Sequence, residues 1–311
     1  MAALPFVFQN DARLIAFDGV KWRNPHRIAR LIHSKTGTKL VFAHSLGVRE
    51  PITIVVKPLD GQTISIDLAD HLFAKIRLFW LGNETIKKQN FEMIVGSSSS
   101  LTLDLAVMGN TAGQSLLTLL AIVSENAVLS INQLILLQGK TQYDSLIQLK
   151  GKAANFRQTT LCVAGKNDAT TVKQVVKHES PATISEIENS LVALNKGKIA
   201  FEVNGIIAKG NAKSKCNQHN RGVILTEGSI IQADPKLYID EFDVEAGHGA
   251  AIGQIDEDEL FYLESRGLSE IEAKRLIVTG YLHPFLDGLD HPTYQAYFAK
   301  QIDARFEGDE R

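Results

Sequence analysis

The chain has 311 residues, 44% of them hydrophobic, and its 33 basic and 35 acidic side chains leave a net charge of −2. We expect about two structural units with at least one sizeable core, and no nucleic-acid partner, because the charge is balanced. Residues 1–11 lack the basic region followed by an apolar region that marks a secretory signal peptide. No stretch approaches the ~18 consecutive apolar residues of a membrane span, so we expect a cytoplasmic protein without membrane contact.

Residues 1–38 are predicted to form a short N-terminal segment that is partly helical. The helix is expected over Asn24–His33, where Pro25 suits a first helical turn. A solvated helix face explains the basic side chains of this stretch.

Residues 39–254 are predicted to be rich in short strands. Apolar residues alternate with others at Leu101, Leu103, Leu105 and Val107, which is the spacing of a strand with one buried face. No repeat of fixed length is present, and alternation alone leaves a sandwich, a barrel and an irregular β-helix open. Similar runs occur at Phe91–Val95, Val128–Leu137, Ser145–Leu149, Thr170–His178, Lys198–Ile207 and Val223–Leu225.

Residues 255–311 are predicted to form a helical domain. Asp256 with Glu259, and Ser269 with Glu272, have the spacing of helix caps, and a glycine between them suits the end of the first helix. Gly267 is the glycine between the first and second helices. A third helix is expected to have Asp290 and Pro292 in its first turn.

Two apolar faces are expected on these helices, and each packs either on the protein's own β-tract or on another subunit. The face of the second helix is predicted to contain Ala273, Leu276, Ile277, Gly280 and Tyr281. The face of the third is predicted to contain Tyr294, Phe298, Ile302 and Phe306.

Common catalytic motifs are absent from the sequence. No phosphate-binding G-x-x-x-x-G-K-[ST] loop, G-x-S-x-G elbow or H-E-x-x-H helix occurs, so we expect a protein that is not an enzyme and binds no nucleotide itself. A polysaccharide-cleaving β-helix enzyme is a remote alternative, since paired carboxylates are not evident.

His248 is the foremost candidate for a metal ligand. Gly247 and Gly249 flank it without side-chain bulk, and a neutral imidazole is a good ligand for iron. Glu245 is a weaker candidate, as are Cys216 and His219, whose C-x-x-H spacing suits a soft metal. The other cysteine, Cys162, is expected to be a buried small hydrophobe.

The segment Asp243–Leu268 resembles the SufB/SufD family of iron–sulfur cluster assembly proteins. It reads E-A-G-H-G-A-A-I-G-Q-I and continues through D-E-L-F-Y-L-E-S-R-G. The resemblance implies a mainly β fold, a right-handed parallel β-helix or irregular β-solenoid, with a C-terminal helical domain. The chain carries little of the longer N-terminal helical segment common in the family, so functions of that segment are not carried over.

Within this family the chain is more similar to SufD-type than to SufB-type members. SufB-type chains usually carry a cysteine and a glutamate where this sequence has His219 and Gly249. Many SufD-type chains have a cysteine at the position of Ala246, which puts a second sulfur ligand from this motif in doubt.

The resemblance also implies a function and partners. A SufD-type scaffold subunit pairs with SufB and binds the ATPase SufC through its C-terminal helices, in a SufBCD complex. A transient iron–sulfur cluster or iron then lies at the SufB–SufD interface, with His248 as a ligand by its place in the motif. A SufB-type or homodimeric scaffold remains the main alternative, including a homodimer of the isolated chain.

Overall fold

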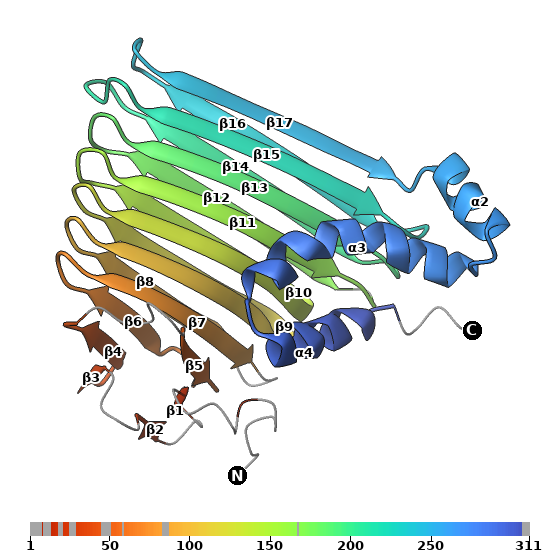
Figure 1. The fold of residues 1–311 in the computed structure, drawn as a ribbon, viewed down its shortest axis with the longest axis horizontal. Helices are drawn as coiled ribbons and strands as arrows, with labels where there is room; N and C mark the ends of the chain where they lie inside the picture. The colour runs from red at the N-terminus through yellow and green to blue at the C-terminus, as the bar shows by residue number, and fades with distance from the viewer. Residues whose placement is uncertain are drawn as a thin grey trace.

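The protein is a parallel β-solenoid of about seven turns with three helices after it, as Figure 1 shows. The computed structural model describes residues 8, 14–17, 21–24, 29–44, 51–57, 59–82, 87–166 and 168–306, without the side chains of 110–113. The predicted β-solenoid is therefore confirmed, and so is the position of the helical residues after the strands.

The strands are β1 (Leu14–Phe17), β2 (Trp22–Arg23), β3 (Arg30–His33), β4 (Gly37–Phe42), β5 (Ile52–Val56), β6 (Thr63–Leu68), β7 (Phe73–Gly82), β8 (Lys88–Val95), β9 (Ser100–Val123), β10 (Val128–Leu149), β11 (Asn155–Ala164), β12 (Ala169–His178), β13 (Ile184–Ala193), β14 (Lys198–Ile207), β15 (Lys215–Ile224), β16 (Ile230–Ile239) and β17 (Glu245–Gln254). The helices are α2 (Glu257–Ser265), α3 (Glu270–Gly288) and α4 (Pro292–Asp303).

Each turn of the solenoid contributes one strand to each of two faces. The first face continues from the first half of β10 through β11, β13, β15 and β17, and the second continues from the last half of β10 through β12, β14 and β16. These pairings are parallel. Between β1 and β4 the described pairings include two antiparallel ones, β1–β2 and β3–β4.

Equivalent residues on one face stack in columns that run along the solenoid. Val128, Asn155, Ile184, Lys215 and Glu245 form one column, and the steps between them are 27, 29, 31 and 30 residues. These unequal steps explain why the sequence shows no repeat of fixed length. Residues at alternate positions along each strand face the interior, which fixes the buried columns.

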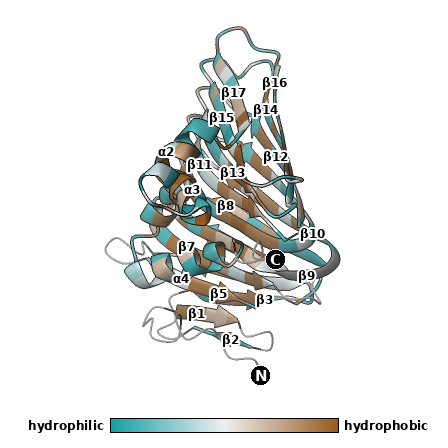
Figure 2. Ribbon diagram, turned by 90° about the vertical axis from the view of Figure 1, so that its right-hand side faces the viewer, coloured by the Kyte–Doolittle hydropathy of each residue, from teal (hydrophilic) through white to brown (hydrophobic). Residues whose placement is uncertain are grey.

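The interior of the solenoid is an apolar core built from these columns. Trp80, Tyr143 and Phe156 are among its largest members, each 1% exposed or less. Figure 2 shows hydrophobic residues along the strands of the stacked turns. Burying aliphatic and aromatic side chains from every turn is the main stabilising contribution to such a fold.

The predicted helix caps are present in the structure. Asp256 accepts hydrogen bonds from the backbone N–H groups at the start of α2, and Ser269 forms a capping box with Glu272 at the start of α3. Gly267 lies between the two helices with φ +95°, a left-handed conformation that glycine adopts without strain. His291 is the N-cap of α4, while Asp290, which we expected in the first turn, precedes the cap.

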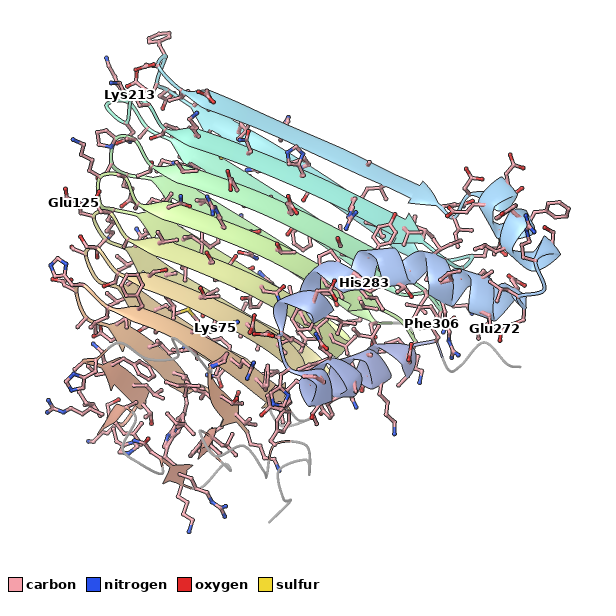
Figure 3. All side chains as sticks on the ribbon, in the orientation of Figure 1. Lys75, Glu125, Lys213, Glu272, His283 and Phe306 are labelled. Atoms are coloured by element: carbon pink, nitrogen blue, oxygen red, sulfur yellow. The ribbon has the colours of Figure 1, made fainter. Side chains whose placement is uncertain are left out.

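Helices α3 and α4 cover part of the outer surface of the first face, as seen in Figures 1 and 3. Their apolar side chains and the outward residues of the strands form a second core, in which the rings of Phe298 and Phe79 lie 4.9 Å apart. The buried residues of α4 are Tyr294, Phe298 and Ile302, with Phe306 following, as predicted. This face therefore packs on the protein's own β-tract.

Two other predictions are wrong. Arg30–His33 form strand β3 within the expected helix over 24–33, because this stretch pairs with β4; residues 25–28 lie outside the described residues. The buried face of α3 also differs, since Leu276 is 53% exposed and Gly280 is exposed. The residues of α3 that are buried against the strands are Ala273, Val278, Leu282 and Phe285.

None of the helices in the described part of the chain is long and apolar enough to cross a membrane.

Candidate functional site

The candidate residues lie on β15 and β17, at the C-terminal end of the solenoid. β17 pairs with β15 in parallel register, with Lys215 opposite Glu245 and Gln218 opposite His248. In Figure 1, β17 is the outermost strand of its face. Its ten residues include none that is buried, so this turn exposes side chains that earlier turns cover.

His248 lies in the middle of β17 with an exposed side chain. It follows the column of inward residues Gln158, Ile187 and Gln218, so it sits directly above the apolar and amide side chains of the interior. Within the described part of the chain, its imidazole has no hydrogen-bond partner. The ring is therefore available to a ligand or to another chain.

Glu245 points in the outward direction and already has a partner. Its carboxylate lies 2.8 Å from the Nζ atom of Lys215, which is the opposite residue on β15. Residues an odd number apart on one strand face opposite sides, so Glu245 and His248 do not converge on one site. An exposed ion pair of this type explains the carboxylate without a metal.

Cys216 faces the interior of the solenoid and is 0% exposed. Burial raises the pKa of its thiol, while the neighbouring side chains of Ser185 and Gln218 oppose that shift. Cys162 is also buried within the interior core, as expected, and burial raises the pKa of its thiol to about 12.

His219 lies on the outer side of β15 and does not join Cys216. Their C-x-x-H spacing places them on opposite faces of the strand. The expected clamp between Cys216 and His219 is therefore not formed.

A hollow of about 530 Å³ lies beside His219, under α3. Glu188 is the register neighbour of His219, and Arg221 follows two residues later on the same side. Arg221 donates from Nε to the Ser190 hydroxyl, and its guanidinium lies over the Tyr281 ring at 5.3 Å. Polar and charged side chains therefore line part of the hollow, beside apolar residues of β17 and α3.

The four candidates therefore do not form one cluster. Among the described residues, no group of three or more His, Cys, Asp or Glu side chains is arranged to hold a metal ion. A metal at this end of the molecule needs ligands from a second molecule or from the metal's own inorganic partners. The sequence did not reveal the neighbours Glu188 and Gln218, because the unequal steps between turns hide the register that brings them beside His219 and His248.

Comparison with known proteins identifies a family for most of the chain. Residues 68–281 match the family described as SUF system FeS cluster assembly, SufBD core domain. The matched region contains every strand from β7 to β17 and most of α3.

Curated relatives include SufD proteins. The chain is 33% identical over 153 residues to the iron-sulfur cluster assembly protein SufD of Bacillus subtilis, and 23% identical over 192 residues to that of Escherichia coli. The aligned regions are 49% and 61% of this chain. It is also 32% identical over 141 residues, or 44% of this chain, to a SufBD family protein of Staphylococcus aureus strain USA300.

These alignments cover 35%, 45% and 30% of the lengths of the respective relatives, so the chain spans less than half of each. The family profile, in contrast, matches well over half of this chain. The chain therefore belongs to the SufBD family of iron–sulfur cluster assembly proteins, in which its relatives include SufD.

Proposed function

We propose that this chain is a scaffold subunit that pairs with SufB through the open end of its solenoid and supplies His248 to a nascent iron–sulfur cluster. The observation that carries the proposal is the position of His248, whose imidazole lies on an exposed edge strand and has no partner among the residues that the structure describes. A SufBD scaffold role explains why the site offers one imidazole and no converging acid–base pair. The cluster is the cargo of the complex.

The backbone of β17 supports pairing along this edge. The N–H groups of Glu245 and Ile255 donate to the carbonyl oxygens of Ser214 and Ile224 in the preceding turn. In a parallel pair the N–H groups of alternate residues point to the same neighbour, so the odd-numbered residues of β17 direct their N–H groups at β15. The even-numbered residues, His248 among them, direct their N–H groups away from β15. A second strand added at this edge would satisfy those groups beside His248.

Two proline variants test this pairing. Ala250→Pro removes an N–H group that faces away from β15, and so should block addition of a strand while leaving the β15 ladder intact. Ala251→Pro is the matched control, because it removes an N–H group directed at β15 and should destabilise the last turn of the free chain. Co-purification with SufB and SufC measures the effect. Full SufB binding by folded Ala250→Pro would contradict edge pairing, and a homodimer without SufB would favour the homodimeric scaffold.

His248→Ala tests the ligand. The side chain is exposed, so we expect the free energy of unfolding to change by roughly 0.5 kcal/mol or less and the complex to assemble. Iron and sulfide content of the complex should fall, because alanine supplies no ligand atom. His219→Ala is the matched control on the other side of the sheet and should retain the cluster. Equal iron and sulfide in the His248→Ala complex would remove this residue from the mechanism.

SufC binding is assigned to the outer surface of α2 and α3. The apolar face of α4 is covered by the protein's own strands, but Phe261 and Tyr262 of α2 are 71% and 55% exposed, and Leu276 of α3 is 53% exposed. Leu276→Glu should weaken co-purification with SufC and leave the unfolding transition unchanged. Lys300→Glu, a charge change on α4, is the comparison variant. Unchanged SufC binding by both Leu276→Glu and Phe261→Glu would remove this surface from the proposal.

A further inference from the structure

Two charged residues on the outer side of the first face, Glu188 and Arg221, differ from the charged pair beside them. Arg157 on β11 and Glu186 on β13 bind each other across neighbouring turns, with Arg157 Nε 3.0 Å from the carboxylate. Glu188 and Arg221 lie later in β13 and β15 and form no ion pair with any residue that the structure describes. Both line the hollow of about 530 Å³ under α3, so an acidic and a basic group face this space without partners of opposite charge.

The guanidinium of Arg221 is held in place by two neutral contacts. Its Nε donates to the hydroxyl of Ser190, a residue that is only 5% exposed. Its plane lies over the ring of Tyr281 on α3, with 5.3 Å between the guanidinium carbon and the ring centroid. Neither of its Nη groups has a hydrogen-bond partner among the described residues. A guanidinium fixed in this way presents a pair of N–H donors that matches the two oxygens of a carboxylate.

Glu188 provides the opposite charge on the other side of the hollow. It is the register neighbour of His219, and Arg221 follows His219 by two residues, so all three side chains point outward on the same side of the sheet. The hollow therefore presents a carboxylate, an imidazole and a guanidinium in sequence. Its volume lies within the range of roughly 300–1,000 Å³ that is usual for small-molecule sites.

The floor of the hollow is kept low by small residues of β17. Gly249 and Ala251 are its outward residues here. Glycine weakens a strand, and Gly249 does not have the left-handed backbone that would require one. A Cβ atom built on Gly249 would meet no atom closer than His219 Nδ1, at 3.9 Å. Packing within the chain therefore does not explain this glycine, whereas close approach of a ligand does.

We propose that this hollow binds a free α-amino acid with an apolar side chain, with its carboxylate on Arg221 and its ammonium group on Glu188. An α-amino acid has its two charged groups on one carbon atom, so a single molecule can contact both residues. Glu188 disfavours phosphate and other polyanions, and Arg221 disfavours a simple amine. The apolar side chain of the ligand lies over Gly249 and Ala251, against Pro284 of α3. The site does not depend on the proposed scaffold function.

The ligand contacts the strands and α3 together, so it binds the folded chain and not the unfolded one. A saturating amino acid should consequently raise the melting temperature of the full chain.

Titration of the full chain with L-leucine, followed by saturation-transfer NMR, tests the proposal. We expect saturable binding of leucine. Isocaproate keeps the carboxylate and isoamylamine keeps the amine, and each should bind at least about tenfold more weakly because one charged group of the hollow stays unpaired. Absence of leucine binding, or equally tight binding of isocaproate, would overturn the proposal.

Four variants locate the site. Arg221→Gln and Glu188→Gln should each weaken leucine binding at least about tenfold. The matched controls Arg157→Gln and Glu186→Gln alter an exposed pair on the same face and should keep the affinity of the unmodified chain. Unchanged binding by either hollow variant, or lost binding in either control, would contradict the assignment.

Gly249→Val tests the hollow without changing a charge, because valine suits a strand and its side chain fills the floor. We expect it to lose leucine binding and to retain a cooperative unfolding transition. Leucine binding equal to that of the unmodified chain would overturn the proposal. If the unmodified chain does not bind leucine and Arg221→Gln weakens co-purification with SufB, the hollow is a subunit contact; the scaffold function then stands although this proposal fails.

Discussion

His178 shows how burial of one residue couples this fold to pH. It is 1% exposed, lies on the inner side of β12 and is held by hydroxyl groups on both ring nitrogens. Burial lowers its pKa from 6.5 to about 4, because the charged imidazolium would lose its hydration. The unfolded chain therefore binds one more proton than the folded chain between these pH values.

The stability supplied by neutral His178 is fully present above pH 6.5 and is lost as the pH falls towards 4. For this shift we expect the free energy of unfolding to lose roughly 3 kcal/mol between pH 7 and 4. His178→Gln keeps polar contacts without titrating and should flatten this dependence. Urea unfolding at several pH values measures it, and an equal slope in both proteins would contradict the prediction.

Asp104 has the opposite effect on how the free energy of unfolding depends on pH. Burial raises the pKa of its carboxyl from 3.8 to about 6, despite the Arg77 guanidinium at 3.9 Å. The folded chain therefore binds the extra proton in this case, so the contribution of Asp104 becomes more favourable as the pH falls from 6 towards 3.8. In Asp104→Asn, the loss of stability on acidification should become steeper. This variant separates the two titrations.

At the scale of elements, polar clamps fix α3 and α4 to the solenoid. Arg305, just after α4, donates to the Asp168 carboxylate at 2.8 Å and to the Leu136 carbonyl at 3.2 Å. Asp168 also accepts from the Gly139 and Gly165 N–H groups. At the end of α3, Arg77 donates to the Leu289 carbonyl at 2.9 Å.

Arg305→Ala should destabilise the protein by about 3–5 kcal/mol, because it leaves the Asp168 carboxylate buried without its cation. The exposed pair of Arg157 and Glu186 is the control, and Arg157→Ala should cost at most about 1 kcal/mol. Denaturant unfolding measures both. We expect one transition for strands and helices together; a separate early loss of helix signal would show that the helices form an independent domain.

The sequence predicted an element correctly where that element depends on residues close together in the chain. Caps at Asp256 and Ser269 need neighbours three residues away, so both helix starts were predicted. The runs Val128–Leu137 and Ser145–Leu149 were predicted as strands too, but the structure joins them in β10. Gly139, with φ +83°, turns the chain between two faces without ending the strand.

Contacts between turns were not predictable in the same way. The spacing of Cys216 and His219 suggested one site, whereas alternation along β15 places them on opposite faces of the strand, and the register with β17 puts Cys216 opposite Ala246 and Gln218 opposite His248. This register depends on turns of unequal length. The buried face of α3 likewise depends on which strands lie beneath it. Of the residues that the helical period predicted for this face, Ala273 is buried, whereas Leu276 and Gly280 are exposed.

At the scale of the whole molecule, burial decreases along the solenoid towards its open end. Seven of the ten residues of β11 are buried, one of the ten residues of β16 is buried, and none of β17 is. Turns of a solenoid contact mainly their neighbours, so each local stability reflects the turns on either side. The last turn has a neighbour on one side within this chain, and the proposed partner would supply the other.

Hydrogen exchange on the full chain should therefore show a gradient. Amides of β17 that donate to β15 can exchange by separating the last turn, which exposes little apolar surface, whereas amides of β11 require disruption of the central core. We expect exchange in β17 to be at least roughly 100-fold faster than in β11. Adding SufB should slow the β17 amides, including that of His248, and leave β11 unchanged. Equal protection of β11 and β17 in the free chain would mean that the open end is already closed by contacts other than those of the solenoid turns.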